Sequence, residues 1–289
     1  MNYAIAYVVY NPTVEQIERI NEISFGHPVY VYDNSETISE LPYNKDIVLV
    51  RNGRNDGIAV GLNILLETAS GDGRSHIITM DQDSLIDDHF IKKLISLAGV
   101  DDREIIVAPM HHTGDITYDK DLVGKSSQKL YVLTTMTSGN LLNVQFAIDV
   151  GKFEEKYFID YVDHEFCLRA NRKGYKVVIS KDLKMEHSLG HSEQKFSLLS
   201  LEFVPTFHAP VRRIYMTRNR SDVWRKYFAI YPRWVLRDFM RFNKELLGIV
   251  VFEDNKLIKV YSIVAGFYLF IMNRWGKAEL RYLVNGAKK

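Results

Sequence analysis

The sequence predicts an α/β fold with a mostly parallel sheet, followed by a helical and basic C-terminal extension. In the first half of the 289 residues, short β-branched runs alternate with helical periodicity, which is typical of strand–helix–strand units. From about residue 212 onward the pattern is that of helices joined by short loops. With 46% hydrophobic and 25% charged residues, the composition is that of a folded globular protein and excludes intrinsic disorder.

The first half contains four predicted strands. Ala4 to Val9 is a nearly continuous apolar run, as expected for a buried parallel strand. A helix follows it, because Thr13 and Gln16 have the spacing of a capping box. Three apolar residues of this helix share one face: Val14, Ile17 and Ile20. The other three strands are predicted at Val29–Tyr32, Ile47–Val50 and Ile77–Met80.

Later elements are predicted in the same way. The turn-rich segment 51–57 is followed by a helix with four apolar residues on its buried side: Ile58, Leu62, Leu65 and Ala69. Another helix is expected near Asp87. Residues 101–211 mix strands, such as Tyr131–Thr137, with a helix over about Asp163–Lys173.

Charge is unevenly distributed along the chain. Residues 212–289 hold 17 Lys/Arg against 6 Asp/Glu, a net +11, whereas residues 1–211 carry a net −10. The basic part also holds many aromatic residues, which suits an anionic membrane surface. A soluble helical subdomain with a basic face is the alternative, and no recognition motif supports nucleic acid. The longest apolar run, Val260 to Met272, is too short to span a bilayer.

The termini and the cysteine content bear on the compartment. The single cysteine, Cys167, excludes an intramolecular disulfide and fits a reducing environment. The first residues lack the pattern of a signal peptide and are expected to form a strand. We therefore expect a cytoplasmic protein, attached peripherally to the inner face of the cell membrane.

Polar residues follow each predicted strand of the first half. Asn11, Asp33, Asn52 and Asp81 all lie just past a strand end. Ligand groups of open α/β sheets gather at the carboxyl ends of the strands, so these residues are expected on one edge of one sheet. Asp33 either accepts hydrogen bonds from a nucleotide base or closes an ordinary turn.

Asp81-Gln82-Asp83 is the sharpest chemical signal. Two carboxylates that flank one residue at a strand end can bind a hard divalent cation, which in turn can hold a diphosphate. The alternative is a solvated acidic turn. His187, which follows the strand-like run 177–179, is a candidate for a further metal ligand, and His191 is a less favoured candidate.

A second acidic cluster lies at the start of a predicted helix. Asp160, Asp163 and Glu165 fall within six residues of one another beside apolar neighbours. Carboxylates in a first helical turn are stabilised by unpaired N–H groups, so at least one of them is expected to cap the helix. A carboxylate in this position can also deprotonate an acceptor hydroxyl.

In this order, these elements resemble the inverting family 2 glycosyltransferases, and among them the bacterial rhamnosyltransferase-like group. The resemblance covers about residues 3–220. The stretches that carry it are Val9-Tyr10-Asn11-Pro12, Tyr32-Asp33-Asn34-Ser35, Asn55-Asp56-Gly57-Ile58-Ala59 through Asn63, Asp81-Gln82-Asp83, Thr137-Ser138-Gly139-Asn140, Phe158 to Ala170, the histidine segment around His187, His208-Ala209-Pro210-Val211-Arg212-Arg213 and Arg218-Asn219.

The resemblance implies a glycosyltransferase A-type, Rossmann-like fold and a role for each matching residue. Asp163 would be the catalytic base and Glu165 its support. Asp83 would ligate Mg²⁺ or Mn²⁺, with His187 as a further ligand. The nucleotide sugar would be bound by five residues: Asn11, Asp33, Asn55, Gly57 and Asp81. Two departures from the family pattern are Val162 before the base and Gln82 at the centre of the metal motif, where it is expected to point aside.

The domains and the reaction follow as expectations. Residues 1–211 would form the catalytic domain, with a nucleotide-binding half (1–100) and an acceptor half (101–211), and 212–289 the extension. The donor implied by the resemblance is dTDP-L-rhamnose, with a UDP-hexose as the alternative, and the acceptor a cell-surface glycan or lipid-linked oligosaccharide. Two alternatives come from other classes of protein. One is a metal-dependent nucleotidyltransferase, which would need a Gly-rich phosphate loop near the N-terminus. The other is an inert glycan- or membrane-binding module, which would not need both Asp83 and Asp163.

Overall fold

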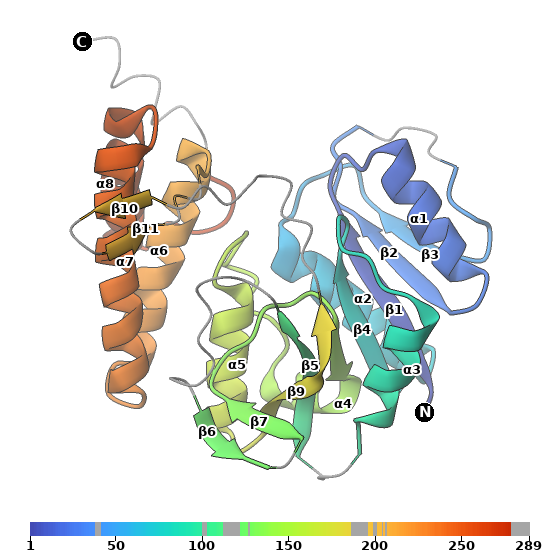
Figure 1. Cartoon of the computed structure of the whole chain (residues 1–289). Helices are drawn as coiled ribbons and strands as arrows, with labels where there is room; N and C mark the ends of the chain where they lie inside the picture. Colours follow the sequence, from blue (N-terminus) through green and yellow to red (C-terminus); the bar gives the residue numbers. More distant parts are fainter. Residues whose placement is uncertain are drawn as a thin grey trace. The chain divides into compact units, whose positions relative to one another are not determined.

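A computed structural model describes residues 1–37, 42–99, 103–111, 122–126, 128–185, 196–198, 201–203, 205 and 207–278 (Figure 1). The chain forms two compact units. The first comprises 1–155 and 162–188, and the second 156–161 and 189–289. The boundary predicted between residues 211 and 212 therefore lies inside the second unit.

The first unit is built on a nine-stranded sheet in the order β3-β2-β1-β4-β8-β5-β9-β7-β6. Its first four strands in that order are all parallel. The apolar runs of the sequence predict each of them to within one residue. Their bounds are β1 Tyr3–Val9, β2 Val29–Asp33, β3 Val48–Arg51 and β4 His76–Asp81.

The other strands make the sheet mixed, because β8 and β7 run antiparallel to their neighbours. Their bounds are β5 Glu104–His111, β6 Leu122–Lys125, β7 Lys129–Val132, β8 Asn140–Asn143 and β9 Lys176–Met185. The predicted strand Tyr131–Thr137 is wrong beyond Val132. The Asn171 side chain donates to the carbonyls of Val132 and Leu133, both at 3.2 Å, and β7 ends there.

The described residues of the first unit form five helices: α1 Val14–Ser24, α2 Ile58–Gly71, α3 Asp88–Ser96, α4 Val144–Val150 and α5 Val162–Arg172. The predicted capping box of α1 is confirmed, since Thr13 and Gln16 exchange both hydrogen bonds. Helix α2 lies close to the sheet because Gly61 has no side chain. A Cβ there would stand 2.8 Å from Tyr32 and 2.9 Å from Val8.

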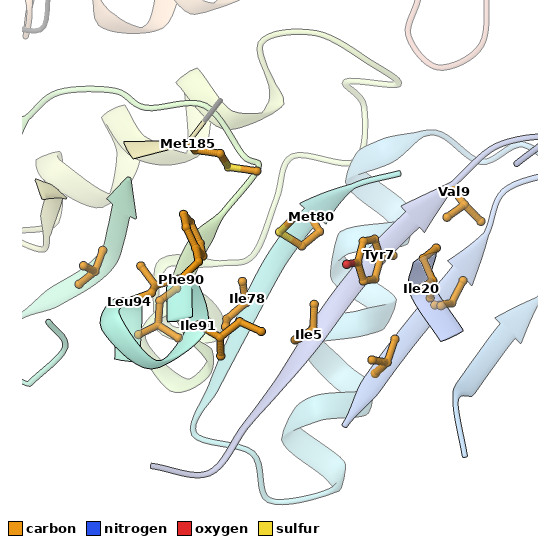
Figure 2. Packing of buried hydrophobic residues seen from close by; sticks show 14 of the residues in the cluster. Ile5, Tyr7, Val9, Ile20, Ile78, Met80, Phe90, Ile91, Leu94 and Met185 are labelled. Carbon is orange, nitrogen blue, oxygen red and sulfur yellow. The ribbon is translucent and has the colours of Figure 1, made fainter. Parts of the chain in front are cut away.

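The apolar core on the opposite face of the sheet joins β1 and β4 to helices α1 and α3 (Figure 2). Alternate residues of β1 point into this core, as the period of a strand requires. The buried members labelled in Figure 2 are Ile5, Tyr7, Val9, Ile20, Ile78, Met80, Phe90, Ile91, Leu94 and Met185. This packing holds the carboxyl ends of β1, β2 and β4 in fixed register.

The described part of the second unit contains three long helices and a short hairpin. The helices are α6 Pro210–Tyr227, α7 Pro232–Phe252 and α8 Lys256–Ile271, and the hairpin strands are β10 Phe196–Leu198 and β11 Leu201–Phe203. Within the described residues, no helix is long and apolar enough to cross a membrane. Helices α7 and α8 nevertheless expose large apolar side chains.

Residues 156–161 belong to the second unit because buried polar contacts join them to its helices. The hydroxyl of Tyr157 donates to Asp222 of α6 at 2.6 Å. The hydroxyl of Tyr161 donates to Asp238 of α7 at 2.9 Å. The amide of Asn219 donates to the carbonyls of residues 159 and 160 at 2.8 and 2.9 Å. The chain thus crosses between units immediately before α5.

Candidate active site

The predicted edge of the sheet is formed by the carboxyl ends of four parallel strands. In the ladders, Val8 pairs with Asp81 and Val9 with Asp33, so both aspartates end strands that flank β1. Asn11 follows β1 in the chain, and Asn52 follows β3. The structure therefore brings the strand-end residues to one edge.

Asp33 is buried and closes a turn. Its Oδ1 accepts a hydrogen bond from the Ser35 N–H at 2.9 Å. The Ser35 hydroxyl in turn accepts from the N–H of Asn11 at 2.7 Å, and the N–H of Asn34 donates to the Val9 carbonyl at 2.8 Å. These bonds join the turns after β1 and β2, so Asp33 has the turn-closing role, and its contact with a base stays a prediction.

The loop before α2 packs against the same turn. The Asn34 side chain accepts from the N–H of Asp56 at 2.8 Å, and that of Asn55 accepts from Gly57 at 3.2 Å. Gly57 has a φ of 91°, a conformation that favours glycine, and it precedes α2 without a side-chain cap. The first N–H groups of α2 are thus available to an anionic ligand.

Gln82 lies between the two carboxylates of the metal motif and contacts the turn after β1. Its side chain accepts from the N–H of Tyr10 at 2.7 Å, and donates to the Tyr10 carbonyl at 3.3 Å and to Gln16 at 3.4 Å. It therefore fixes the turn to the neighbouring strand end. Asp81 is half-buried and Asp83 is exposed.

The donor set at this turn fits a hard cation in its chemistry. Carboxylate oxygens are the protein ligands that Mg²⁺ takes, usually one or two together with waters and substrate phosphates. Among the described residues, no group of three or more His, Cys, Asp or Glu side chains could hold a metal ion. His187 and His191 lie outside the described residues. The described metal ligands would therefore be Asp83, with Asp81 beside it.

The start of α5 decides between the acids of the second cluster. Asp160 and Tyr161 have φ values of 66° and 63°, so the helix begins at Val162 and Asp163 lies in its first turn. The carboxylate of Asp160 accepts a hydrogen bond from Arg212 at 3.0 Å within the second unit. Asp160 is consequently an ion-pair partner there, whereas Asp163 belongs to the first unit with the strand ends.

Asp163 is held by the residue after it. Its Oδ1 accepts from the His164 N–H at 2.8 Å, and His164 Nδ1 lies 2.8 Å from the same oxygen. Burial raises the pKa of this carboxyl, but the charge and hydrogen bonds of His164 outweigh burial, and the pKa lies below its usual value. The carboxylate is therefore ionised at neutral pH, as a general base requires. His164 is not among the residues that the sequence predicts for the site.

Asp163 also lines a small void of about 10 Å³, no larger than one water molecule, with residues from the central strands. Thr79 of β4 and Asn140 of β8 line the same void. The segment Thr137–Asn140 also reaches the metal motif, because the N–H of Asp81 donates to the Ser138 hydroxyl at 3.2 Å. One short segment thus borders both the acidic strand end and the candidate base.

Glu165 lies elsewhere on α5 and is fully buried. It forms an ion pair with Arg169, whose Nη2 is 2.8 Å from Oε2. Arg169 also donates to the carbonyls of Val150 and Lys152 at 2.8 and 2.6 Å. Glu165 thereby ties α5 to the end of α4, and its role at the site stays a prediction.

Comparison with known proteins identifies the family. Residues 29–153 match the model described as Glycosyl transferase family 2. The dTDP-rhamnosyl transferase RfbF of Shigella flexneri is 31% identical over 248 residues, which are 78% of this chain and 80% of that protein. The chain belongs to glycosyl transferase family 2. The predicted resemblance to its rhamnosyltransferase-like group is confirmed.

Solved structures agree with the fold of this glycosyltransferase. GalNAc-T7, solved with UDP, GalNAc and Mn²⁺, gives a TM-score of 0.57 at 12% identity over 99% of this chain. The chain spans a little over half, 57%, of that protein. The mannosyltransferase PcManGT of Pyrobaculum calidifontis, solved with GDP-Man and Mn²⁺, gives 0.55 at 13% identity, covering 99% of this chain and 79% of that one. The predicted glycosyltransferase A-type fold is confirmed.

Proposed function

We propose that the chain transfers L-rhamnose from dTDP-L-rhamnose to a hydroxyl of a cell-surface glycan or lipid-linked oligosaccharide, with inversion at the anomeric carbon. The observation that carries the proposal is the segment Thr137–Asn140, which contacts the Asp81 N–H through Ser138 and lies beside Asp163. The identity to a dTDP-rhamnosyl transferase supports this donor over a UDP-hexose. Family membership favours glycosyl over nucleotidyl transfer.

The donor would lie along the edge of the sheet. Asp33 would accept hydrogen bonds from the base, and Asn11, Asn55 and Gly57 would line the nucleotide. Asp81 would lie near the ribose. A divalent cation held by Asp83, with His187 as a further ligand, would supply positive charge to the departing diphosphate. The uncapped start of α2 suits the same anion.

Asp163 would act on the acceptor. Its carboxylate takes the proton from the acceptor hydroxyl as the oxygen forms a bond to the anomeric carbon and the diphosphate leaves from the opposite side. His164 holds one carboxylate oxygen, which leaves the other to receive the proton. Glu165 would support this geometry through Arg169, since that ion pair fixes the position of α5.

The replacement Asp163→Asn tests the proposal, because it keeps the size of the side chain but cannot accept the proton. Loss of a general base typically lowers the rate by about 10²- to 10⁴-fold, or roughly 3–5 kcal/mol of barrier. We expect this loss in rhamnosyl transfer with unchanged affinity for dTDP-L-rhamnose. Asp149→Asn, at an exposed position on α4, is the matched control.

Two results would count against the proposal. Transfer by a folded Asp163→Asn protein within threefold of the unaltered chain would remove Asp163 as the base. Transfer from a UDP-hexose, with none from dTDP-L-rhamnose, would refute the donor. Because donor binding and product formation are measured separately, an inert binding protein would be recognised by binding without transfer.

We also propose that the protein is cytoplasmic and attached peripherally to an anionic membrane surface through its second unit. Large apolar side chains on α7 are exposed, among them Leu236, Phe239 and Met240. Basic residues such as Arg233 and Lys244 lie on the same helix. Exposed apolar side chains among basic ones are the combination that binds at a membrane interface.

A further inference from the structure

The second unit holds a cavity of about 670 Å³ between α6, α8 and residues 274–278. This volume lies in the range of small-molecule sites, about 300–1,000 Å³. Three of its lining residues are cationic: Arg218, Arg274 and Lys277. The others are apolar or aromatic: Ile214, Tyr261, Val264, Ala265, Tyr268, Leu269, Trp275 and Ala278. None of the described lining residues is an acid.

Arg218 is the most constrained of the three cations. It is 1% exposed, and its Nε and Nη1 donate to Asn219 and to the Arg274 carbonyl at 3.2 and 3.4 Å. The described residues offer Nη2 no acceptor. Burial lowers the pKa of this guanidinium to about 10. The guanidinium also lies over the rings of Tyr215 and Trp275, at 5.3 and 5.5 Å, but these contacts carry no negative charge. A buried charge without an anionic partner is costly, so an anion in the cavity would stabilise it.

The wall of the cavity is set by close packing of two helices. A Cβ on Gly266 of α8 would stand 2.7 Å from the Ile214 carbonyl of α6 and 2.7 Å from Thr217. The N–H of Ala278 donates to the Tyr215 hydroxyl at 2.7 Å and fixes the segment that closes the site. The cationic groups are therefore held on a formed scaffold.

The cavity is continuous with an apolar face of α8. Tyr261, Val264 and Tyr268 line the cavity and also belong to an exposed row. The row follows the spacing of three and four residues that places side chains on one helical face. Its members are Leu257, Tyr261, Val264, Tyr268 and Ile271. A free phosphate would leave this face in water, whereas an attached apolar chain would cover it.

We propose that this cavity binds the phosphate of an amphiphile, with the phosphate beside Arg218 and the apolar chain along the exposed row of α8. The bound molecule would be the lipid phosphate that carries the acceptor glycan, a role that rests on the proposed function. Binding itself does not depend on the donor or on Asp163. The site would hold the acceptor's carrier in the unit that also meets the membrane.

Calorimetry on the full chain tests the inference with three probes below their micelle concentrations: decyl phosphate, decyl maltoside and inorganic phosphate. We expect decyl phosphate to bind at least tenfold more tightly than either of the others. Arg218→Met should weaken its binding by about ten- to hundredfold, since hydrogen bonds to charged groups are worth that much. Arg225→Met, which removes an exposed charge from the same helix, should leave binding unchanged.

Equal binding of inorganic phosphate and decyl phosphate would overturn the inference in favour of a free-anion site, and equal binding of decyl maltoside would reduce it to an apolar surface. If Arg218→Met does not fold, as judged by circular dichroism, Ala265→Leu decides instead, because it fills the cavity without removing a charge. If the folded Ala265→Leu variant bound decyl phosphate as tightly as the unaltered chain does, the proposed binding site would be refuted. The affinity of the unaltered chain for dTDP-L-rhamnose is measured in the same way. If that chain binds decyl phosphate but not dTDP-L-rhamnose, the result contradicts the proposed function and leaves the phosphate site standing.

Discussion

Asp222→Asn should remove an acid-sensitive part of the stability of the second unit. The Asp222 side chain is fully buried. Burial alone raises the pKa of its carboxyl, but hydrogen bonds from Lys156, Tyr157 and Arg225 outweigh burial and lower the pKa to about 2 from an ordinary 3.8. These bonds have lengths of 2.6, 2.6 and 2.7 Å.

The sign and size of the effect follow from linkage between protonation and folding. Because the folded pKa is depressed, the stabilisation is complete above the unfolded pKa, near 4, and is lost as the pH falls toward 2. A difference of this size corresponds to about 2 kcal/mol. Between pH 5 and pH 2, the free energy of unfolding should fall for both proteins. The fall for the unaltered chain should exceed the fall for Asp222→Asn by about 2 kcal/mol.

Tryptophan fluorescence during urea unfolding is a suitable assay. The chain has three tryptophans, Trp224, Trp234 and Trp275, and all lie in the second unit, so the signal reports that unit alone. Asp254→Asn removes the same charge at an exposed position of this unit and serves as the control. If the unaltered chain and Asp222→Asn lost stability in parallel from pH 5 to pH 2, the carboxylate would not be held ionised by these contacts.

Three further predictions concern the metal, the base and the membrane. Asp83→Ala should abolish the Mn²⁺ dependence of dTDP-L-rhamnose binding without unfolding the chain, and persistent metal dependence in calorimetry would remove Asp83 from the site. His164→Gln should move the acid limb of the kcat/KM profile to higher pH, because His164 lowers the pKa of Asp163; an unmoved limb would contradict this. Replacing both Leu236 and Met240 with Asp should weaken binding to anionic vesicles, measured by co-sedimentation, by at least tenfold. Val14→Asp, at an exposed apolar residue of the first unit, is the control and should bind as the unaltered chain does. Equal binding of the unaltered chain and both variants would argue against attachment through α7.

The elements that sequence predicts well are those in which local pattern and tertiary burial agree. The strands β1 and β4 are continuous apolar runs because both faces are covered, so their bounds follow to within one residue. The capping box at Thr13 is equally local. The strand-end positions of Asp33 and Asp81 follow from the strands themselves.

The elements that sequence predicts poorly depend on distant partners. Strand β7 ends where Asn171, about forty residues away in the chain, takes its carbonyls. The start of α5 depends on left-handed conformations at Asp160 and Tyr161. Neither residue is a glycine, so the sequence does not indicate these conformations. Residues 156–161 join the second unit through contacts with residues 52 to 120 positions away. Patterns within a short window do not contain such pairings.

The chain passes from the second unit to the first just before the candidate base. Tyr161 is fixed by Asp238 and Arg220 in the second unit, and α5 begins with the next residue. Asp163 is therefore only two residues from a side chain that is fully anchored elsewhere. Its other constraints, His164 and the Glu165–Arg169 ion pair, belong to the first unit. The contacts that direct the Asp163 carboxylate therefore lie in the first unit, together with all the predicted contacts of the donor.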